Sequence, residues 1–546
     1  MLRALVVALL APAGVLLFWL ALSSSGSRAD FVVACDELRT IDPQRVSWLD
    51  EIQTTQCLFE GLTRLDPRTL VPEPAVAETW EISPDRRSIV FHLRAGLRWS
   101  NGATLVTEHF RYAWLRALQP ETEAQYANLL FVINGAEAYY RSRLDSATGN
   151  YLPPDSVGIH APDERTLTLD LQRPCPYLLE ALALPIFAPL YPPALEQFAD
   201  ATGRIPAAQR HLWTRPGALV GNGPFTLKSW EFKRALLLER NPFHRDAQTG
   251  GVNSIEIMIV GSPNAALVAY QTGRVDLVRT LEPDVARTLR TQQPPPSDFH
   301  EGNRYATYFL RINCKRPPLD NPALRQALSL AIDRAALCKH VLGLGETPAN
   351  SFVPPLKEHA SNPNGESHVA NVAAARTALV RSGFDPHSRP LRLACANDPP
   401  QQRRINEAIQ RMWEETLGIT VELEVQERKV LSERIRNLDY DLARSDWFGD
   451  YLDPSTFLDL FVSDSAQNRT GWANAAYDAI VRAAASEVDE AQRLGEYAKA
   501  ESILCVDELP IIPLFHRTGQ ILLSPRIDGL FDNLRDILPL YRARIR

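Results

Sequence analysis

The stretch of sequence that decides the fold runs from Arg403 to Trp447 and reads "RRINEAIQRMWEETLGITVELEVQERKVLSERIRNLDYDLARSDW". It predicts a helix, the strand "ITVELEVQ", a second helix "VLSERIRNL" and the strand "YDLARSDW". Helices that alternate with strands are typical of α/β units, in which ligands bind beyond the carboxyl ends of parallel strands. The sequence therefore predicts an α/β fold with a candidate site just after Trp447.

The same alternation extends in both directions from this stretch. Upstream, "NVAAARTALVRSGF" predicts a helix and "PLRLACA" a strand; downstream, helices at about 475–486 and 490–506 precede the strand "PIIPLFH". Another helix is expected to begin at Pro322 and to run to Gly343. The first half of the chain instead predicts short strands and a hairpin, "VGNGPFTLKSWEFKRALLLERNPFH", and a helix capped by Thr107.

Composition excludes several classes of protein. A chain of 546 residues with 45% hydrophobic residues is expected to form two or three domains. The net charge of −7, without basic runs among aromatics, predicts no nucleic-acid partner. The seven cysteines form no C-x-x-C pair and no histidine cluster accompanies them, so we expect no metal and no cofactor. The usual nucleophile, zinc and phosphate motifs are missing, so no catalytic residue is predicted, although the many carboxylates leave an acid–base pair open.

The N-terminus predicts export. Arg3 precedes an apolar run from Ala4 to Leu22, and a polar Ser/Gly segment follows. Residues 1–29 are therefore either a cleaved signal peptide or a retained membrane anchor, and either one places the rest of the chain outside the cytoplasmic membrane. Cys35 is expected in a first strand rather than at a lipidation site, because polar residues separate it from the apolar run.

The candidate site is the stretch "ARSDWFGDYLDPSTFLDLF", from Ala443 to Phe461, which mixes aspartates with aromatic residues. It contains Asp446, Trp447, Phe448, Asp450, Tyr451 and Asp453. Two interpretations fit this pattern: a decorated loop, or an anchor for a positively charged ligand. Asp453 precedes Pro454 and a helical pattern, which predicts a helix start.

At this point the sequence resembles a known family, the extracellular solute-binding proteins of family 5, which include periplasmic oligopeptide- and dipeptide-binding proteins of ABC importers. The resemblance covers nearly all of the chain after the N-terminal segment and rests on the order and spacing of several motifs. These are "TIDPQ", "CLFEGLTRLD", "PEPAVAETWEIS", "FHLRAGLRWSNGATLVTEHFRYAW", "NGPFTLKSW", "YQTGRVDL", "NPALRQALSLAIDR" and "YDLARSDWFGDYLDPSTFL".

The resemblance implies a periplasmic-binding-protein-like α/β fold of the class II type. Two lobes with mixed sheets would close about a hinge, and an extra third domain would extend the first lobe. The expected boundaries are 30–72 with 205–305 and 516–546 for domain I, 73–204 for domain II, and 306–515 for domain III. The expected partners are an oligopeptide and the permease subunits of an ABC transporter. A monomer is expected, with membrane contact only through the N-terminal segment.

The resemblance also implies roles for individual residues. In peptide-binding members the aspartate of a "W-x-x-D" pattern, here Asp450, pairs with the α-ammonium group of the ligand. Strand edges near Glu60, Gly61 and Leu62 and around Asp446, Trp447 and Phe448 would bind the peptide backbone by β-augmentation. Trp447 and Tyr451 would form apolar walls. Arg444 would either bind a ligand carboxylate or serve as a structural ion-pair partner.

Two departures from the family pattern stand out. Several members carry a disulfide between the residue after the motif tryptophan and the strand that enters the third domain. The corresponding residues here are Phe448 and Ala306, so that bridge is not used. Where other members have a tryptophan after "VELEV", this chain has Arg428, which favours acidic side chains or longer peptides.

Other functions are compatible with the same fold. One alternative is another solute: a murein peptide, a metal chelate or a different small molecule. A second is an exported hydrolase or a membrane-anchored sensor. Turnover distinguishes the hydrolase, because a binding protein returns its peptide unchanged.

Overall fold

The computed structural model describes residues 28–144, 150–200, 204–356, 369–397 and 400–546. The predicted signal peptide or anchor, residues 1–29, lies almost entirely outside the described residues. Within the described part of the chain, no helix is both long and apolar enough to cross a membrane.

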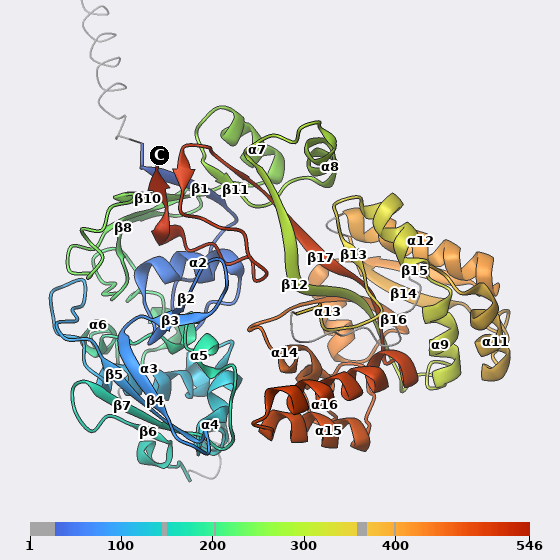
Figure 1. Cartoon of the computed structure of the whole chain (residues 1–546), viewed down its shortest axis with the longest axis horizontal. Helices are drawn as coiled ribbons and strands as arrows, with labels where there is room; N and C mark the ends of the chain where they lie inside the picture. The colour runs from blue at the N-terminus through green and yellow to red at the C-terminus, as the bar shows by residue number, and fades with distance from the viewer. Residues whose placement is uncertain (1–27, 145–149, 201–203, 357–368, 398–399) are drawn as a thin grey trace, which may run out of the picture.

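One mixed sheet of 11 strands runs through the molecule, and two long antiparallel strands at its centre join its two halves (Figure 1). These central strands are β12 (Phe299–Ile312) and β17 (Ile511–Leu523). Beyond β17 the order is β11 (Leu277–Val278), β1 (Phe31–Cys35), β10 (Ser254–Ile259), β9 (Ala235–Arg240) and β8 (Phe225–Glu231). Beyond β12 lie β16 (Leu442–Phe448), β14 (Leu391–Ala396) and β15 (Val421–Gln426), and β13 (Thr347–Pro348) pairs with β17.

Separate hydrophobic cores lie in the two halves. Two cores combine residues 29–299 with 521–543, whereas three others are built from residues 305–515. We call residues 306–515 the second lobe and the rest of the described chain the first lobe. The chain enters the second lobe along β12 and leaves it along β17, so these two strands are the hinge. The predicted two-lobed fold class is confirmed, while the boundaries at 72/73 and 204/205 stay predictions, because one core continues through both segments.

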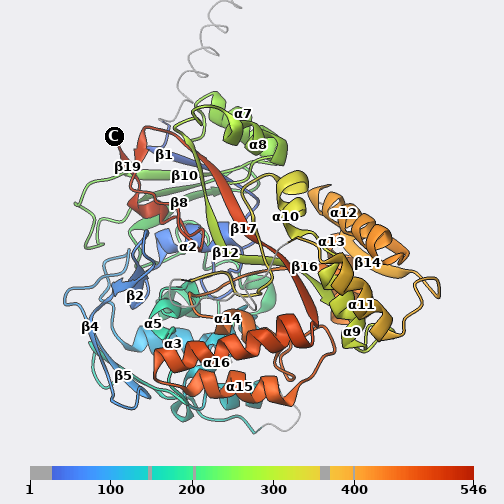
Figure 2. The same ribbon diagram turned by 45° about the vertical axis from the view of Figure 1, so that its right-hand side comes forward.

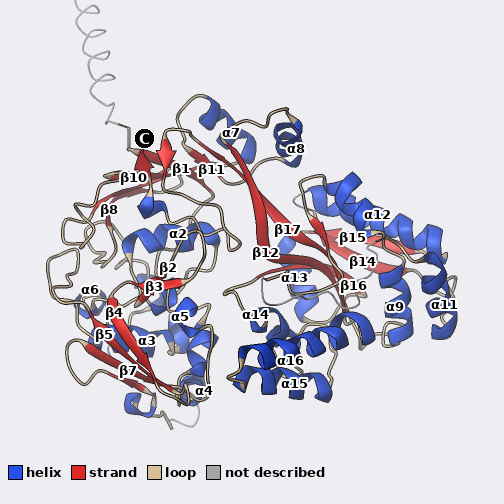
Figure 3. Ribbon diagram, in the orientation of Figure 1, coloured by secondary structure: helices blue, strands red, loops and turns tan. Residues whose placement is uncertain are grey.

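The second lobe has the predicted alternation of helices and strands. In chain order it contains α11 (Val372–Ser382), β14, α12 (Pro400–Leu417), β15, α13 (Arg428–Arg436), β16, α14 (Ser455–Leu458), α15 (Ala475–Ser486), α16 (Glu490–Ser502) and β17. Strand β14 runs parallel to both β15 and β16. α11 and α12 pack with α9 (Pro322–Leu330) in one core, and α13 packs in another (Figure 3).

Helix α12 shows why the pattern was readable from the sequence. Its buried apolar residues include Ile405, Ala408, Ile409 and Trp413, at the spacing of one helix face. The indole N–H of Trp413 donates to the carbonyl oxygen of Leu328 at 2.8 Å, so its polar atom is satisfied inside the core.

The helix predicted from Pro322 to Gly343 is wrong in its length. It begins as predicted, since the side chain of Asn321 accepts a bond from the Ala323 N–H, but α9 ends at Leu330. Asp333 then accepts a bond from the Ala336 N–H at 2.7 Å and starts a new helical segment, α10 (Arg334–Ala336) followed by η6 (Leu337–Leu342). An aspartate that caps a new turn competes with continuation of the old helix.

The first lobe contains a second sheet of four strands, in the order β4 (Ala77–Ile82), β5 (Ser88–Leu93), β7 (Thr166–Asp170), β6 (Ile159–His160). Its main helices are α2 (Leu49–Leu58), α3 (Glu108–Ala117), α4 (Ala136–Leu144), α5 (Leu178–Ala181), α6 (Pro192–Glu196), α7 (Pro263–Gln271) and α8 (Pro283–Thr291). The predicted hairpin is β8–β9. The predicted cap is wrong: the Thr107 hydroxyl donates to the carbonyl oxygen of Asp163 and does not cap α3.

Candidate functional site

Strand β16 carries the predicted site and has one open edge. It pairs with β12 along its whole length, from Leu442 to Phe448. Its pairing with β14 covers only Leu442 and Ala443. From residue 444 onward, the β14 side of β16 is therefore free of strand partners among the described residues. The carboxyl ends of the parallel strands β14, β15 and β16 meet at this edge of the sheet.

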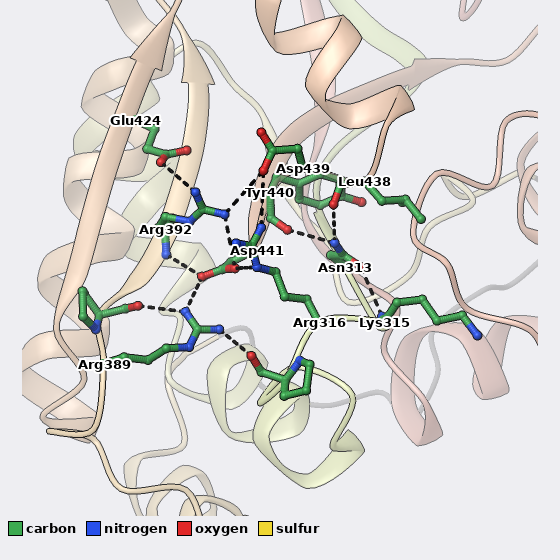
Figure 4. Close-up of polar contacts among 12 residues, drawn as sticks. Asn313, Lys315, Arg316, Arg389, Arg392, Glu424, Leu438, Asp439, Tyr440 and Asp441 are labelled. Atoms are coloured by element: carbon green, nitrogen blue, oxygen red, sulfur yellow. Dashed lines mark hydrogen bonds and ion pairs between the residues drawn. The ribbon is translucent and has the colours of Figure 1, made fainter.

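The opposite end of β16 is fixed by a buried carboxylate. Asp441 is fully buried and pairs with Arg389 at 2.7 Å and with Arg316 at 3.1 Å (Figure 4). It also accepts a bond from the backbone N–H of Arg392 on β14 at 3.1 Å. Two strands and the loop after β12 are thereby tied to one side chain, which fixes the position of the open edge.

The first predicted residues on the open edge form a charged group. Asp446 pairs with Arg517 of β17 at 2.8 Å and with Arg444 at 3.4 Å. The Arg444 guanidinium lies 5.2 Å from the ring centroid of Tyr308, and its Nε has no hydrogen-bond partner among the described residues. Arg444 is thus an ion-pair partner of Asp446, one of the two predicted alternatives, and it keeps one unused N–H.

Trp447 and Phe448 point to different environments. Trp447 packs partly buried against the aromatic core of the second lobe, and its indole N–H has no partner in the described chain. Phe448 is 48% exposed, and the Arg517 guanidinium lies 5.4 Å from its ring centroid. Phe448 therefore presents an apolar surface to solvent, whereas Trp447 belongs to the packed interior of the second lobe.

Asp450 is a partly buried carboxylate without an ion pair among the described residues. The N–H of the preceding Gly449 donates to the carbonyl oxygen of Tyr305 at 2.8 Å, and the Asp450 N–H donates to the Thr456 hydroxyl at 3.0 Å, so the backbone is fixed. Burial raises the pKa of Asp450 from its usual 3.8 to about 6, and Arg535 and Thr456 oppose this only in part. A desolvated carboxylate of this kind favours a cationic ligand.

The two lobes touch directly beside Asp450, where α14–α16 face α5 (Figure 2). The ring of Tyr451 stacks on Tyr177 of the first lobe, with a centroid distance of 3.7 Å and an interplanar angle of 6°. The Leu452 N–H donates to Glu180 Oε2 at 2.8 Å. A crevice of about 240 Å³ between the lobes is lined by Tyr177 and Glu180 on one side and by Leu452 and Asp453 on the other. The two lobes are therefore in contact next to Asp450.

Arg535, from the loop after β18 (Ile527–Asp528), completes the surroundings of Asp450. It interacts electrostatically with Glu180, Asp450 and Tyr126, and burial lowers its pKa. Burial raises the pKa of Glu180, which the Leu452 N–H and Arg535 partly oppose. The site thus contains two carboxyl groups and one guanidinium from three distant parts of the chain.

The segment from Glu60 to Leu62 lies elsewhere in the first lobe. Glu60 forms an ion pair with Arg245. Burial alone would raise the pKa of Glu60, but Arg245 and His244 hold it well below its usual range. The backbone N–H and carbonyl of Glu60 bond to Asn222, and the carbonyls of Gly61 and Leu62 accept backbone N–H groups from residues 75–77. The 330 Å³ cavity beside Glu60 is lined by residues of the first lobe. On its other side the segment packs against the α5 region, because the Thr63 hydroxyl donates to the carbonyl oxygen of Leu179 at 2.6 Å and Gly61 lies against the Leu182 carbonyl. The predicted ligand role of Glu60, Gly61 and Leu62 stays a prediction.

Comparison with known proteins gives the family. The model of the bacterial extracellular solute-binding proteins, family 5 (middle region), matches residues 71–469. This chain belongs to that family. It is 28% identical over 500 residues to the periplasmic oligopeptide-binding protein OppA of Escherichia coli K12, covering 90% of this chain and 88% of that protein. It is 31% identical to the probable deoxycholate-binding periplasmic protein YgiS of the same organism, with the same coverage. The structure of the E. coli murein tripeptide-binding protein MppA matches with a TM-score of 0.80, at 28% identity, over 95% of this chain and 99% of that one.

The structure locates the residues of both predicted departures from the family pattern. Ala306 and Phe448 are direct partners in the β12–β16 pairing, which is where a bridge between the two strands would lie. Arg428 is the exposed first residue of α13, just beyond β15, and forms no ion pair among the described residues. Strand β14 separates β15 from β16, so Arg428 is displaced sideways from the β16 edge by about 10 Å, two strand spacings.

Five residues of the site were missed in the sequence. They are Tyr126, Tyr177, Glu180, Arg517 and Arg535. None of them belongs to the Ala443–Phe461 stretch, and no local spacing connects them with it. Only the fold brings them to the end of β16.

Proposed function

We propose that this chain is an extracytoplasmic solute-binding protein that captures oligopeptides between its lobes and delivers them to the permease of an ABC importer. The observation that carries the proposal is Asp450, a desolvated carboxylate without an ion pair among the described residues, at the contact between the lobes. A free peptide has a cationic amino terminus that fits this position. Breaking a buried ion pair typically costs about 3–5 kcal/mol, so such a pair would select peptides with free amino termini.

The open edge of β16 supports backbone recognition. A peptide that adds as a strand beside Arg444, Asp446 and Phe448 would bond to main-chain groups that β14 leaves free. Main-chain bonds do not distinguish side chains, so broad sequence tolerance follows. In this arrangement Phe448 and Tyr451 contact the ligand with Trp447 behind them. Arg444 and Arg428 are available for its carboxylates. The carbonyl groups of Glu60, Gly61 and Leu62 and the Glu60 N–H are occupied within the first lobe, so this segment would contact a peptide backbone through the N–H groups of Gly61 and Leu62.

The related proteins suggest other solutes, and the carboxylate of Asp450 distinguishes those that carry an amine from those that do not. Deoxycholate has no amine to pair with this carboxylate, so a bile-acid ligand is disfavoured. A murein peptide carries a free α-amine, so it is the second candidate that the site accommodates. The proposal further includes a monomer, held at the membrane only by its N-terminal segment, that closes about β12 and β17 and does not chemically change its ligand.

Calorimetry with a mixed-sequence tetrapeptide and its N-acetylated form tests the proposal. The free peptide is expected to bind, and acetylation or Asp450→Ala should each weaken binding at least about a hundredfold, the equivalent of about 3 kcal/mol. Asp464→Ala, at an exposed aspartate of the same lobe, is the matched control. Equal binding of both peptide forms would contradict the ammonium anchor, and recovery of cleaved peptide would identify a hydrolase instead.

A further inference from the structure

The backbone that carries Arg535 is held rigidly beside the hinge. Asn533 accepts bonds from the N–H groups of Arg535 and Ile537 at 3.1 and 3.3 Å, and its amide donates to the carbonyl oxygen of Pro67 at 3.1 Å. The Leu534 carbonyl accepts a bond from the N–H of Tyr305 at 2.6 Å. Arg535 therefore extends from a loop with little conformational freedom. Such rigidity is needed in a residue that binds a ligand group in one geometry.

The guanidinium of Arg535 is only partly used by the protein. Its Nε and Nη1 atoms are buried and have no hydrogen-bond partner among the described residues. Glu180 and Asp450 are the carboxylates that interact electrostatically with Arg535, but neither forms a direct ion pair with it among the described residues. Buried donors without acceptors cost about 1–3 kcal/mol each, so the unpartnered Nε and Nη1 atoms of Arg535 favour a ligand acceptor.

The charges around Arg535 indicate which ligand group fits there: a cation together with a hydrogen-bond acceptor. Asp450, Glu180 and Arg535 sum to one negative charge when all three are ionised, which an ammonium group balances. The ammonium alone leaves the N–H groups of Arg535 unsatisfied. In a peptide, the carbonyl of the first residue is attached to the carbon that carries the ammonium, so one α-aminoacyl unit supplies a cation and an adjacent acceptor.

We propose that Arg535 donates a hydrogen bond to the carbonyl oxygen of the first ligand residue, so that Asp450 and Arg535 together recognise an α-aminoacyl group. This inference rests on the proposed function and specifies its substrate class. Compounds with a free α-amine next to a carbonyl are accepted, while simple alkyl amines and polyamines are rejected. If Arg535 were only a distant counter-ion of Asp450, replacing it would leave the dependence of binding on this carbonyl unchanged.

The test compares the tetrapeptide Ala-Val-Phe-Ala with an analogue in which a trans-alkene replaces the first peptide bond. The alkene keeps the shape and the ammonium but removes the first carbonyl. A bond from a charged donor corresponds to a loss of about ten- to a hundredfold in affinity for the analogue, measured calorimetrically on the full chain. A polyamine such as spermidine should not bind.

Variants assign the effect to Arg535. Because the alkene also removes one N–H, the same pair of ligands is measured on Arg535→Met, where the penalty should shrink by about the same ten- to a hundredfold. Arg535→Lys keeps a charge without the planar fork and should recover only part of the affinity. Arg544→Met, at an exposed arginine of the same C-terminal segment, is the control and should behave as the unmodified protein.

The outcomes separate this inference from the proposed function. If the unmodified protein binds peptide and analogue equally, or if Arg535→Met leaves the alkene penalty unchanged, Arg535 does not read the carbonyl while peptide binding stands. If the unmodified protein binds neither ligand, the proposed function fails and the inference fails with it. If Arg535→Met does not fold, Arg535→Lys carries the same comparison, and an alkene penalty in this variant equal to that of the unmodified protein would overturn the inference.

Discussion

Acidification should weaken peptide binding well above the pH at which an ordinary aspartate is protonated. In the proposed function, ligand binding requires Asp450 to be ionised, and burial raises its pKa to about 6 in this structure, where the lobes touch. An ammonium beside it lowers the pKa in the complex, because an opposite charge favours the ionised carboxyl group. The sign follows: the free protein takes up a proton as the pH falls through about 6, and binding must expel it.

The magnitude follows from the ionised fraction of Asp450. With a pKa of about 6, roughly nine-tenths of the free protein is ionised at pH 7 and roughly one-tenth at pH 5, so affinity falls by up to about tenfold. Molecules whose lobes are open leave Asp450 solvated and reduce this factor. With the usual value near 3.8, affinity would change by less than about a tenth. The ligand adds little between pH 7 and 5, because its amine titrates near 8 and its carboxyl below 4.

Calorimetry at pH 7, 6 and 5, in two buffers of different ionisation enthalpy, measures both affinity and proton release. About half a proton should be released per peptide at pH 6. The other groups near Asp450 are Arg535, Thr456 and Tyr126, which do not titrate in this range. Glu180, whose pKa burial also raises, acts in the same direction and is removed as a variable with Glu180→Gln. An affinity that is unchanged between pH 7 and 5, without proton release, would refute the reasoning.

Three further measurements probe stability and closure. Asp450→Asn should raise the free energy of unfolding at pH 7 by up to about 3 kcal/mol, which is the equivalent of the rise in the pKa of Asp450 from 3.8 to about 6. Urea unfolding at pH 4 should show little of this gain, because the native aspartate is then protonated. Tyr177→Ala removes the stack with Tyr451, which contributes about 0.5–1.5 kcal/mol. Dissociation of the peptide, measured by stopped flow, should become about two- to tenfold faster. An unchanged rate would mean that the stack does not hold the closed form. Asp441→Asn should cost about 3–5 kcal/mol in urea unfolding, with peptide affinity of the folded fraction unchanged; a loss below 1 kcal/mol would contradict its anchoring role.

The sequence predicts what local periodicity controls. The apolar spacing of α12 and the alternation of the second lobe were readable because each element buries one face. The placement of Phe448 opposite Ala306, inferred from the family resemblance, is confirmed by the β12–β16 register. Local rules failed where tertiary contacts compete: Asp333 interrupts a helix by capping its successor, and the Thr107 hydroxyl bonds to residue 163.

Only the part of the site that lies on β16 and in the loop after it could be predicted from the sequence. Asp450 belongs to a recognisable motif, but Arg535 lies in the last loops of the chain and Glu180 in the first lobe. Glu60 illustrates the same limit, because its partner Arg245 is 185 residues away. A charged residue has no local signal for its partner, so its role becomes visible only when the fold is known.

Closure of this protein is therefore energetically conditional on its ligand. Bringing the lobes together gains the Tyr177–Tyr451 stack and the bond from Leu452 to Glu180, which together contribute about 1–3 kcal/mol. It also desolvates Asp450, at a cost of up to about 3 kcal/mol when that group is ionised. These opposing effects are of similar size, so the empty protein has no strong preference for the closed form. An α-ammonium removes the penalty without disturbing the lobe contacts, and the equilibrium then shifts toward closure. In the proposed function, the carboxylate that selects the ligand would thus also couple the closed shape to occupancy.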